Sequence, residues 1–124
     1  MMVRRADEPR PLIWRGNSKS NFAAFPLTVQ REMGYALFVA QMGERHSTKA
    51  KTLGGFAGAT VVEVRERHDG NAYRAVYTVR FAEAVYVLHA FQKKSKKGIA
   101  TPKEEIDLIE KRLKDLIKEK DGRQ

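Results

Sequence analysis

The sequence predicts a small α+β domain with the element order β-α-α-β-β-β-α. Between residues 61 and 91, three short stretches alternate apolar and polar side chains, as half-buried strands do. Before and after them, apolar residues recur at helical spacing. The chain has 124 residues, 42% of them hydrophobic, which suits one compact domain with its own core. We therefore expect a small antiparallel sheet with helices on one face and the other face open.

The N-terminal elements are a strand and two helices. Residues 11–16 read as a short strand that ends at a glycine, and a serine just downstream can cap a short helix over 21–25. Pro26 stops that helix. Thr28 is a favoured N-cap for a longer helix, which Gly43 ends.

The sheet is expected from the middle of the chain. The strands cover 61–66, 73–80 and 84–91, and Asp69-Gly70-Asn71 is a strong hairpin signal between the first two. The preceding residues 44–60 carry glycines and polar residues, so we expect a loop.

The last helix has a clear start. Thr101, Pro102 and Glu104 form a capping box with proline at the first helical position, and the helix runs to about residue 118. Its apolar residues form one stripe: Ile106, Ile109, Leu113 and Leu116. We divide the chain into a flexible arm (1–10), one domain (11–120) and a flexible tail (121–124).

The charge points to an anionic partner. The chain holds 24 Lys and Arg against 15 Asp and Glu, a net charge of +9. Such a balance is typical of nucleic-acid binding and less often of binding to an acidic protein or a membrane surface. The absence of cysteine excludes disulfides and fits a cytoplasmic location. No secretory signal, membrane-spanning run, nucleotide-binding glycine motif, serine-histidine-acid signature or zinc-finger spacing is present.

Two arginines stand inside the strand patterns. Alternation and the hairpin turn place Arg65 and Arg74 on the same, open face, within reach of each other. Two guanidinium groups on one face make a good phosphate clamp, because each can hold two oxygens. The alternative is that each forms a salt bridge with Glu63, Glu66 or Glu83.

Lysines add to this face. Lys93 and Lys94 leave the end of a strand and can be held against the open face, whereas Lys96 and Lys97 supply long-range attraction. His89, on the same strand, is either a packed core residue or a general acid or base. The three histidines have no cysteine or clustered carboxylates beside them, so we expect no metal site and no cofactor.

The segments VVEVR, AYRAVY and VYVLHAFQKKSKKGIATPKEEI, with IWRG near the start, resemble the phage-derived, HigB-like branch of the RelE/ParE toxin superfamily. The resemblance covers nearly the whole chain after residue 10. It implies a small α+β toxin of a type II toxin–antitoxin pair. Many such toxins cleave mRNA on the ribosome without a metal, through attack of the 2′-hydroxyl on the adjacent phosphate.

The resemblance also implies roles for individual residues. Arg74 matches the strand arginine that stabilises the charged transition state, and Lys94, with Lys93, matches a basic residue after the last strand. Arg65 and His89 complete the expected catalytic group. The expected RNA-binding residues are Lys93, Lys96, Lys97, Lys49 and Lys51. The 44–60 loop that carries the last two is either a functional loop or a plain connector.

The chain departs from the family pattern at two points. Val61 and Glu63 stand where studied relatives have lysines, and no tyrosine follows Tyr86. The proton shuttle is therefore open, and two alternatives remain: a ParE-like toxin directed at gyrase, and a non-catalytic RNA-binding relative. The expected partners are a cognate helix-turn-helix antitoxin, the ribosome and mRNA, with no membrane.

Overall fold

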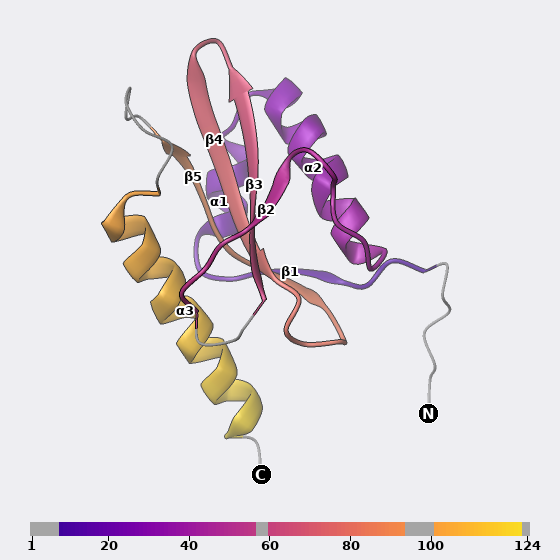
Figure 1. The fold of residues 1–124 in the computed structure, drawn as a ribbon, viewed down its shortest axis with the longest axis vertical. Coiled ribbons are helices and arrows are strands. Elements are labelled where there is room, and N and C mark those ends of the chain that lie inside the picture. The colour runs from indigo at the N-terminus through magenta and orange to yellow at the C-terminus, as the bar shows by residue number, and fades with distance from the viewer. Residues whose placement is uncertain (1–7, 57–59, 94–100, 123–124) are drawn as a thin grey trace.

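The structure, a computed structural model, describes residues 8–56, 60–93 and 101–122. These residues form an α+β fold of five strands and three helices (Figure 1). The elements are β1 (Leu12–Trp14), α1 (Ser18–Ala23), α2 (Leu27–Gln41), β2 (Ala50–Thr52), β3 (Val61–His68), β4 (Asn71–Thr78), β5 (Val85–Lys93) and α3 (Lys103–Asp121). The predicted fold class is confirmed, and the predicted order lacks only β2. Among the described residues, none of the helices is long and apolar enough to cross a membrane.

The strands form one sheet in the order β1-β5-β4-β3-β2. β3, β4 and β5 are antiparallel neighbours, whereas β1 adds to β5 in parallel. β2 pairs with β3 at the opposite edge, with Lys51 opposite Glu63. The prediction that residues 44–60 are only a loop is therefore wrong. Three residues are too few to show an alternating pattern, and their pairing depends on β3.

The β3–β4 hairpin closes through the predicted turn. His68 is opposite Asn71, which leaves Asp69 and Gly70 as a two-residue loop with φ of 50° and 78°. Two positive φ values identify a type I′ turn, whose twist matches that of the flanking strands. This turn fixes the register of the strands and so decides which side chains share a face.

The helix boundaries differ from the prediction in their caps. α2 begins at Leu27 after Pro26, so Thr28 is not its N-cap. Ser18 lies inside α1 and its hydroxyl donates to the carbonyl of Val87 in β5. The end of α2 agrees with the prediction: the N–H groups of Gly43 and the following residue donate to carbonyls in its last turn.

Helices cover both faces of the sheet, with α1 and α2 on one side and α3 on the other (Figure 1). The α2 side buries Met33 and Leu37 against Val62, Val64 and Tyr77. The expectation of an open second face is therefore wrong. On the other face, the part of the sheet away from the β3–β4 turn carries apolar side chains: Val61, Val76 and Leu88. They bury the stripe of α3 formed by Ile109, Leu113 and Leu116.

Polar contacts hold α3 in place. Arg112 donates to the carbonyl of Leu88 at 2.8 Å and to Asn17 Oδ1 at 2.6 Å. Leu88 is the extra residue of a β-bulge in β5, so its carbonyl is available to the helix. Near the C-terminal end of α3, Arg15 pairs with Glu119. α3 therefore covers part of this face of the sheet, and the part nearer the β3–β4 turn carries polar side chains instead.

Candidate functional site

The register of β3, β4 and β5 places three rows of side chains on the α3 face. Directly opposite residues in antiparallel strands share a face. The rows are Arg67–Ala72–Lys93, Arg65–Arg74–Phe91 and Glu63–Val76–His89. The predicted pairing of Arg65 with Arg74 is confirmed. The first two rows contain four cations, and only Glu63 of the third row supplies a carboxylate.

Glu63 holds the two arginines together. Its carboxylate is 1% exposed, and Oε1 accepts from Arg65 Nε at 2.8 Å and from Arg74 Nη1 at 3.1 Å. Oε2 accepts from the Thr101 hydroxyl at 2.7 Å. The salt-bridge alternative for both arginines is therefore realised, and it brings them together. Thr101 is not the N-cap of α3, because its hydroxyl serves this cluster and Pro102 takes the cap position.

Arg74 is the most enclosed of the four cations. Its side chain is 4% exposed, and its Nη1 also donates to the Thr101 hydroxyl at 3.1 Å. Burial lowers the pKa of the Arg74 guanidinium, an effect opposed by Glu63 and reinforced by the positive charge of Arg65. Glu63 and Thr101 hold the Arg74 guanidinium in one position. The guanidinium is therefore preorganised to bind an anion on its remaining side.

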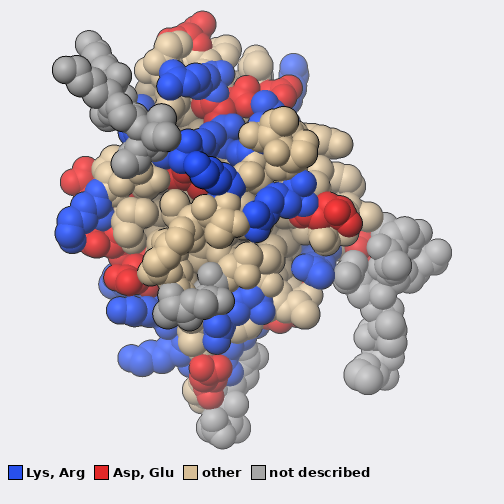
Figure 2. Space-filling model, viewed as in Figure 1, with Lys and Arg blue, Asp and Glu red and all other residues tan. Residues whose placement is uncertain are grey.

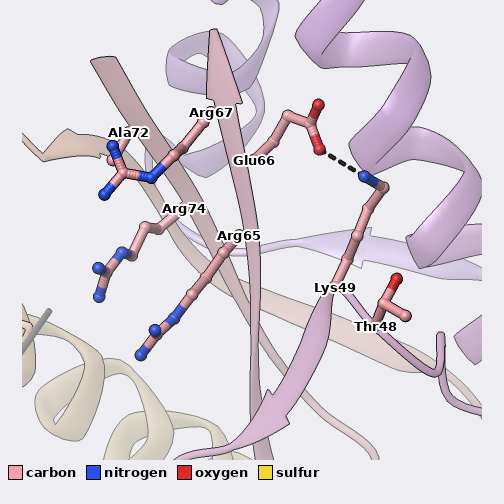
Figure 3. A pocket seen from close by; sticks show the side chains of 7 residues that line it. All are labelled: Thr48, Lys49, Arg65, Glu66, Arg67, Ala72 and Arg74. Carbon is pink, nitrogen blue, oxygen red and sulfur yellow. Dashed lines mark hydrogen bonds and ion pairs between the residues drawn. The ribbon is translucent and has the colours of Figure 1, made fainter. Parts of the chain in front are cut away.

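A hollow of about 470 Å³ lies over these residues. It is lined by Thr48, Lys49, Arg65, Glu66, Arg67, Ala72 and Arg74. Figure 2 shows Lys and Arg side chains gathered over the middle of the sheet, where β3 and β4 lie in Figure 1. In Figure 3, three guanidinium groups extend to the same side of the strands. The small side chain of Ala72, between Arg67 and Lys93, leaves room for a ligand.

The exposed arginines differ in their contacts. Arg65 is 33% exposed on its side chain and keeps Glu63 as a partner. Arg67 is exposed and forms no hydrogen bond or ion pair with any other described residue. Sequence analysis did not select Arg67, although it follows Arg65 by two positions and so points to the same face. Arg67 is therefore the guanidinium in the hollow that can bind an anion without first leaving a partner.

The predicted lysines divide into three groups. Lys49 pairs with Glu66 at 2.8 Å, which raises the pKa of the lysine, and Figure 3 shows both turned away from the guanidinium groups. Lys51 is exposed and lines a second hollow, of about 350 Å³, together with Arg65 and Thr101. Three predicted lysines lie outside the described residues: Lys94, Lys96 and Lys97.

Lys93 belongs to the cluster. It is 5% exposed, and burial lowers its pKa, with further lowering by the positive charges of Arg74, Arg65 and Arg67. Glu63 opposes this effect. A lysine with a lowered pKa gives up a proton more readily than an ordinary one, which suits a general acid.

His89 lies away from the hollow. It is 4% exposed, its Nε2 is 2.8 Å from Glu105 of α3, and its ring stacks on Phe91. Burial lowers its pKa, an effect that the hydrogen bond to Glu105 opposes. Arg112 Nη1 lies 3.5 Å from Nδ1, an arrangement that fits a neutral ring with the proton on Nε2. The structure thus places His89 in the packing of α3 rather than beside Arg74.

The described residues contain no group of three His, Asp or Glu side chains arranged to hold a metal ion. The cluster instead presents N–H donors and one internal carboxylate. Sequence analysis named Glu63 only as one possible salt-bridge partner and missed Thr101 as a member. The alternation of β3 puts Glu63 on the face of Arg65, but its burial depends on the position of α3, which no local pattern gives.

Comparison with known proteins identifies the fold and the family. A family model described as "Phage derived protein Gp49-like" matches residues 20–114. A double arginine-to-alanine mutant of the E. coli toxin RelE, in its free state, has a similar structure. The TM-score is 0.50 at 18% sequence identity, and the alignment covers 67% of this chain and 82% of that chain. No curated protein matches. The resemblance predicted from the sequence is confirmed.

Proposed function

Because the chain belongs to the phage-derived Gp49-like family, we propose that it is the toxin of a type II toxin–antitoxin pair and cleaves mRNA on the ribosome. The observation that supports this proposal is the hollow over Arg65, Arg67 and Arg74, three guanidinium groups on one sheet face. RNA is a polyanion, and arginine binds phosphate through two parallel hydrogen bonds. The proposal includes a cognate helix-turn-helix antitoxin as the second partner.

In the proposed reaction the ribose 2′-hydroxyl gives up its proton to a water molecule while its oxygen forms a bond to phosphorus, and the bond to the 5′-oxygen breaks. The products are a 2′,3′-cyclic phosphate and a 5′-hydroxyl. Negative charge builds up on the non-bridging oxygens in the transition state, so fixed cations accelerate the step. Arg74 supplies that charge. It is fixed by Glu63 and Thr101, so it loses little freedom when the phosphate arrives.

The outer cations receive the RNA. Arg67 is exposed and Arg65 is partly exposed, so they contact the phosphate backbone first. Lys93 is the proton donor to the leaving 5′-oxygen, because its lowered pKa brings its acidity closer to neutral pH. Lys94 remains part of the proposal from the family resemblance. Glu63 acts through the arginines as a positioning residue, since its oxygens are bonded to Arg65, Arg74 and Thr101.

Induced expression in a bacterial host tests the proposal. We would compare the wild-type protein with Arg74→Ala and with Arg31→Ala, which removes an exposed arginine of α2 outside the hollow. The 5′ ends of transcripts are mapped within minutes of induction, and circular dichroism checks that each variant is folded. We expect growth arrest with new cuts in translated mRNA for the wild type and Arg31→Ala, and neither for Arg74→Ala.

Other outcomes would identify the alternatives. Arrest with intact transcripts would assign the activity to gyrase or another protein target. Salt-sensitive RNA binding without arrest would assign a non-catalytic binding role. A folded Arg74→Ala variant that still cuts mRNA would remove Arg74 from the reaction.

A further inference from the structure

A third hollow lies on the opposite face of the sheet from the arginine cluster. Its volume is about 290 Å³, and it lies where the C-terminal end of α2 meets β3 and β4. It is lined by Arg10, Ala40, Gly43, Glu44, Arg45, Val62, Tyr77 and Val79. Val62 and Tyr77 belong to the α2 side of the core, whereas Arg65 and Arg74 are on the α3 side. The two hollows therefore share no lining residue, and nothing in the proposed RNA cleavage uses this one.

The hydroxyl of Tyr77 is one of the polar groups of this hollow. The residue is 1% exposed, and among the described residues its hydroxyl makes no hydrogen bond. A hydroxyl that makes no hydrogen bond within the protein can donate to a bound group without first leaving a partner. Burial raises the pKa of Tyr77, and the positive charge of Arg45 opposes this effect. The hydroxyl is thus protonated at neutral pH, and the Arg45 guanidinium is near enough to interact with it electrostatically.

Two arginines line the hollow together with Tyr77. Arg45 Nη1 donates to the Thr52 hydroxyl at 2.7 Å, which fixes the position of that guanidinium at the edge of the hollow. Arg10 is held through its backbone, since its N–H donates to the carbonyl of Gln41 and its carbonyl accepts from Gln41 Nε2. Its Nε is buried and has no hydrogen-bond partner, and its Nη2 lies 4.0 Å from the Cβ position of Gly43.

We propose that Arg10, Arg45 and the Tyr77 hydroxyl form a carboxylate-binding pocket. Two guanidinium groups and one O–H donor converge on one small volume, and all of them can donate to the oxygens of an acid. Glu44 also lines the hollow and brings its formal charge to +1. That charge matches one carboxylate better than a phosphate, which carries about two negative charges.

The walls of the pocket indicate which kind of group carries the carboxylate. Ala40, Val62 and Val79 give the hollow an apolar lining beside the donors. A short apolar stem that ends in an acid matches both parts, as in an aspartate or glutamate side chain or a peptide C-terminus. The pocket thus fits the acidic residue of a peptide segment. The inference rests on different residues from those of the proposed function and stands independently of it.

NMR titration of the full-length protein tests this pocket at residue level. With ¹⁵N-labelled protein, acetate is added at constant ionic strength against chloride, and the Nε–Hε signals of Arg10 and Arg45 are followed. Phosphate is the competing anion. Two short peptides, one with blocked ends and an internal aspartate and one with a free C-terminus, then distinguish a side-chain acid from a terminal one. We expect the Arg10 and Arg45 signals to shift with acetate until they saturate, and one of the two peptides to bind more tightly than the other.

Variants assign the shifts to the pocket. Arg45→Gln and Tyr77→Phe should each weaken acetate binding about tenfold, the effect of one hydrogen bond to a charged group. Arg31→Gln removes an exposed arginine of α2 outside the pocket and should leave the affinity unchanged. Each variant is compared with its own spectrum without acetate, so a loss of stability is not mistaken for a loss of binding. Equal shifts in all variants, linear shifts without saturation, or tighter binding of phosphate than of acetate would overturn the assignment.

Discussion

Replacing Glu63 with alanine tests how the arginine cluster is held together. The substitution removes a 1% exposed carboxylate that accepts hydrogen bonds from Arg65, Arg74 and Thr101. The guanidinium of Arg74, itself 4% exposed on its side chain, would lose its ion-pair partner Glu63 while Arg65 stays beside it. The protein must then either keep the Arg74 charge in its interior without the Glu63 carboxylate or move Arg74 outward.

The expected loss of stability follows from burial. Breaking a buried ion pair by removing one partner costs about 3–5 kcal/mol. The pair with Arg65 adds little, because that side chain is 33% exposed and exposed pairs contribute about 0–1 kcal/mol. Arg74 borders a hollow into which it can relax, so we expect about 3 kcal/mol. For 124 residues the unfolding entropy is about 0.26 kcal/(mol·K), so Tm should fall by about 11 °C.

Urea unfolding and thermal melting measure this loss. The single tryptophan, Trp14, packs on Phe22 at 5.2 Å between ring centres and reports on the core by fluorescence. Glu66→Ala is the matched control, since it removes a carboxylate of the same strand whose partner, Lys49, is 25% exposed. That control should lose less than about 1 kcal/mol.

A double variant separates the effect of the ion pair on stability from the effect of the volume that its two side chains fill. Glu63→Leu combined with Arg74→Met replaces both charges with apolar side chains, and such replacements are often neutral or stabilising. We expect the double variant to be more stable than Glu63→Ala. If Glu63→Ala loses no more stability than Glu66→Ala, the cluster is not held by its internal carboxylate and the reasoning fails.

Three further predictions concern α3 and its contacts. Gly16 has φ of +55°, and a Cβ there would lie 2.6 Å from Arg112 Cζ. Gly16→Ala should therefore cost at least about 1–2 kcal/mol in urea unfolding, whereas Gly34→Ala, with no atom within 4 Å, should be neutral or stabilising. Ile109→Ala empties a fully buried position and should lower the unfolding free energy by about 2–5 kcal/mol, read from calorimetry. Burial lowers the folded pKa of His89. The unfolded chain, with a histidine pKa of about 6.5, therefore binds the proton first as pH falls, and stability falls with it. The urea midpoint of the wild type should therefore be lower at about pH 5.5 than at about pH 7.5, and His89→Gln should lose the part of this difference that comes from His89.

The elements that the sequence predicted correctly have strong local signals. Asp69 and Gly70 specify a type I′ turn, and that turn with the alternating strands sets Arg65 opposite Arg74. Gly43 ends α2 as expected. β2 was missed because Ala50–Thr52 has no pattern of its own and is a strand only through its pairing with β3.

The site required tertiary information. Thr101 precedes a proline and a glutamate three positions on, which is the pattern of a helix cap, yet its hydroxyl contacts Glu63, 38 positions away in sequence. The burial of Glu63 depends on α3, whose position no strand pattern contains. His89 has an apolar neighbourhood that fits either of its two interpretations, and only the contact with Glu105 distinguishes them. The catalytic roles of Arg74, Lys94 and Lys93 stay predictions.

The parallel pairing of β1 with β5 has a consequence for how the chain folds. Leu12 lies opposite Val85, so this edge of the sheet joins residues 73 positions apart in sequence. The β3–β4–β5 segment is connected by short turns and can form early, whereas the β1 pair must close a long loop and is expected to form late. During synthesis, β1 leaves the ribosome long before its partner exists. The β1 edge is thus added to a sheet whose arginine-bearing strands, β3 and β4, have already paired.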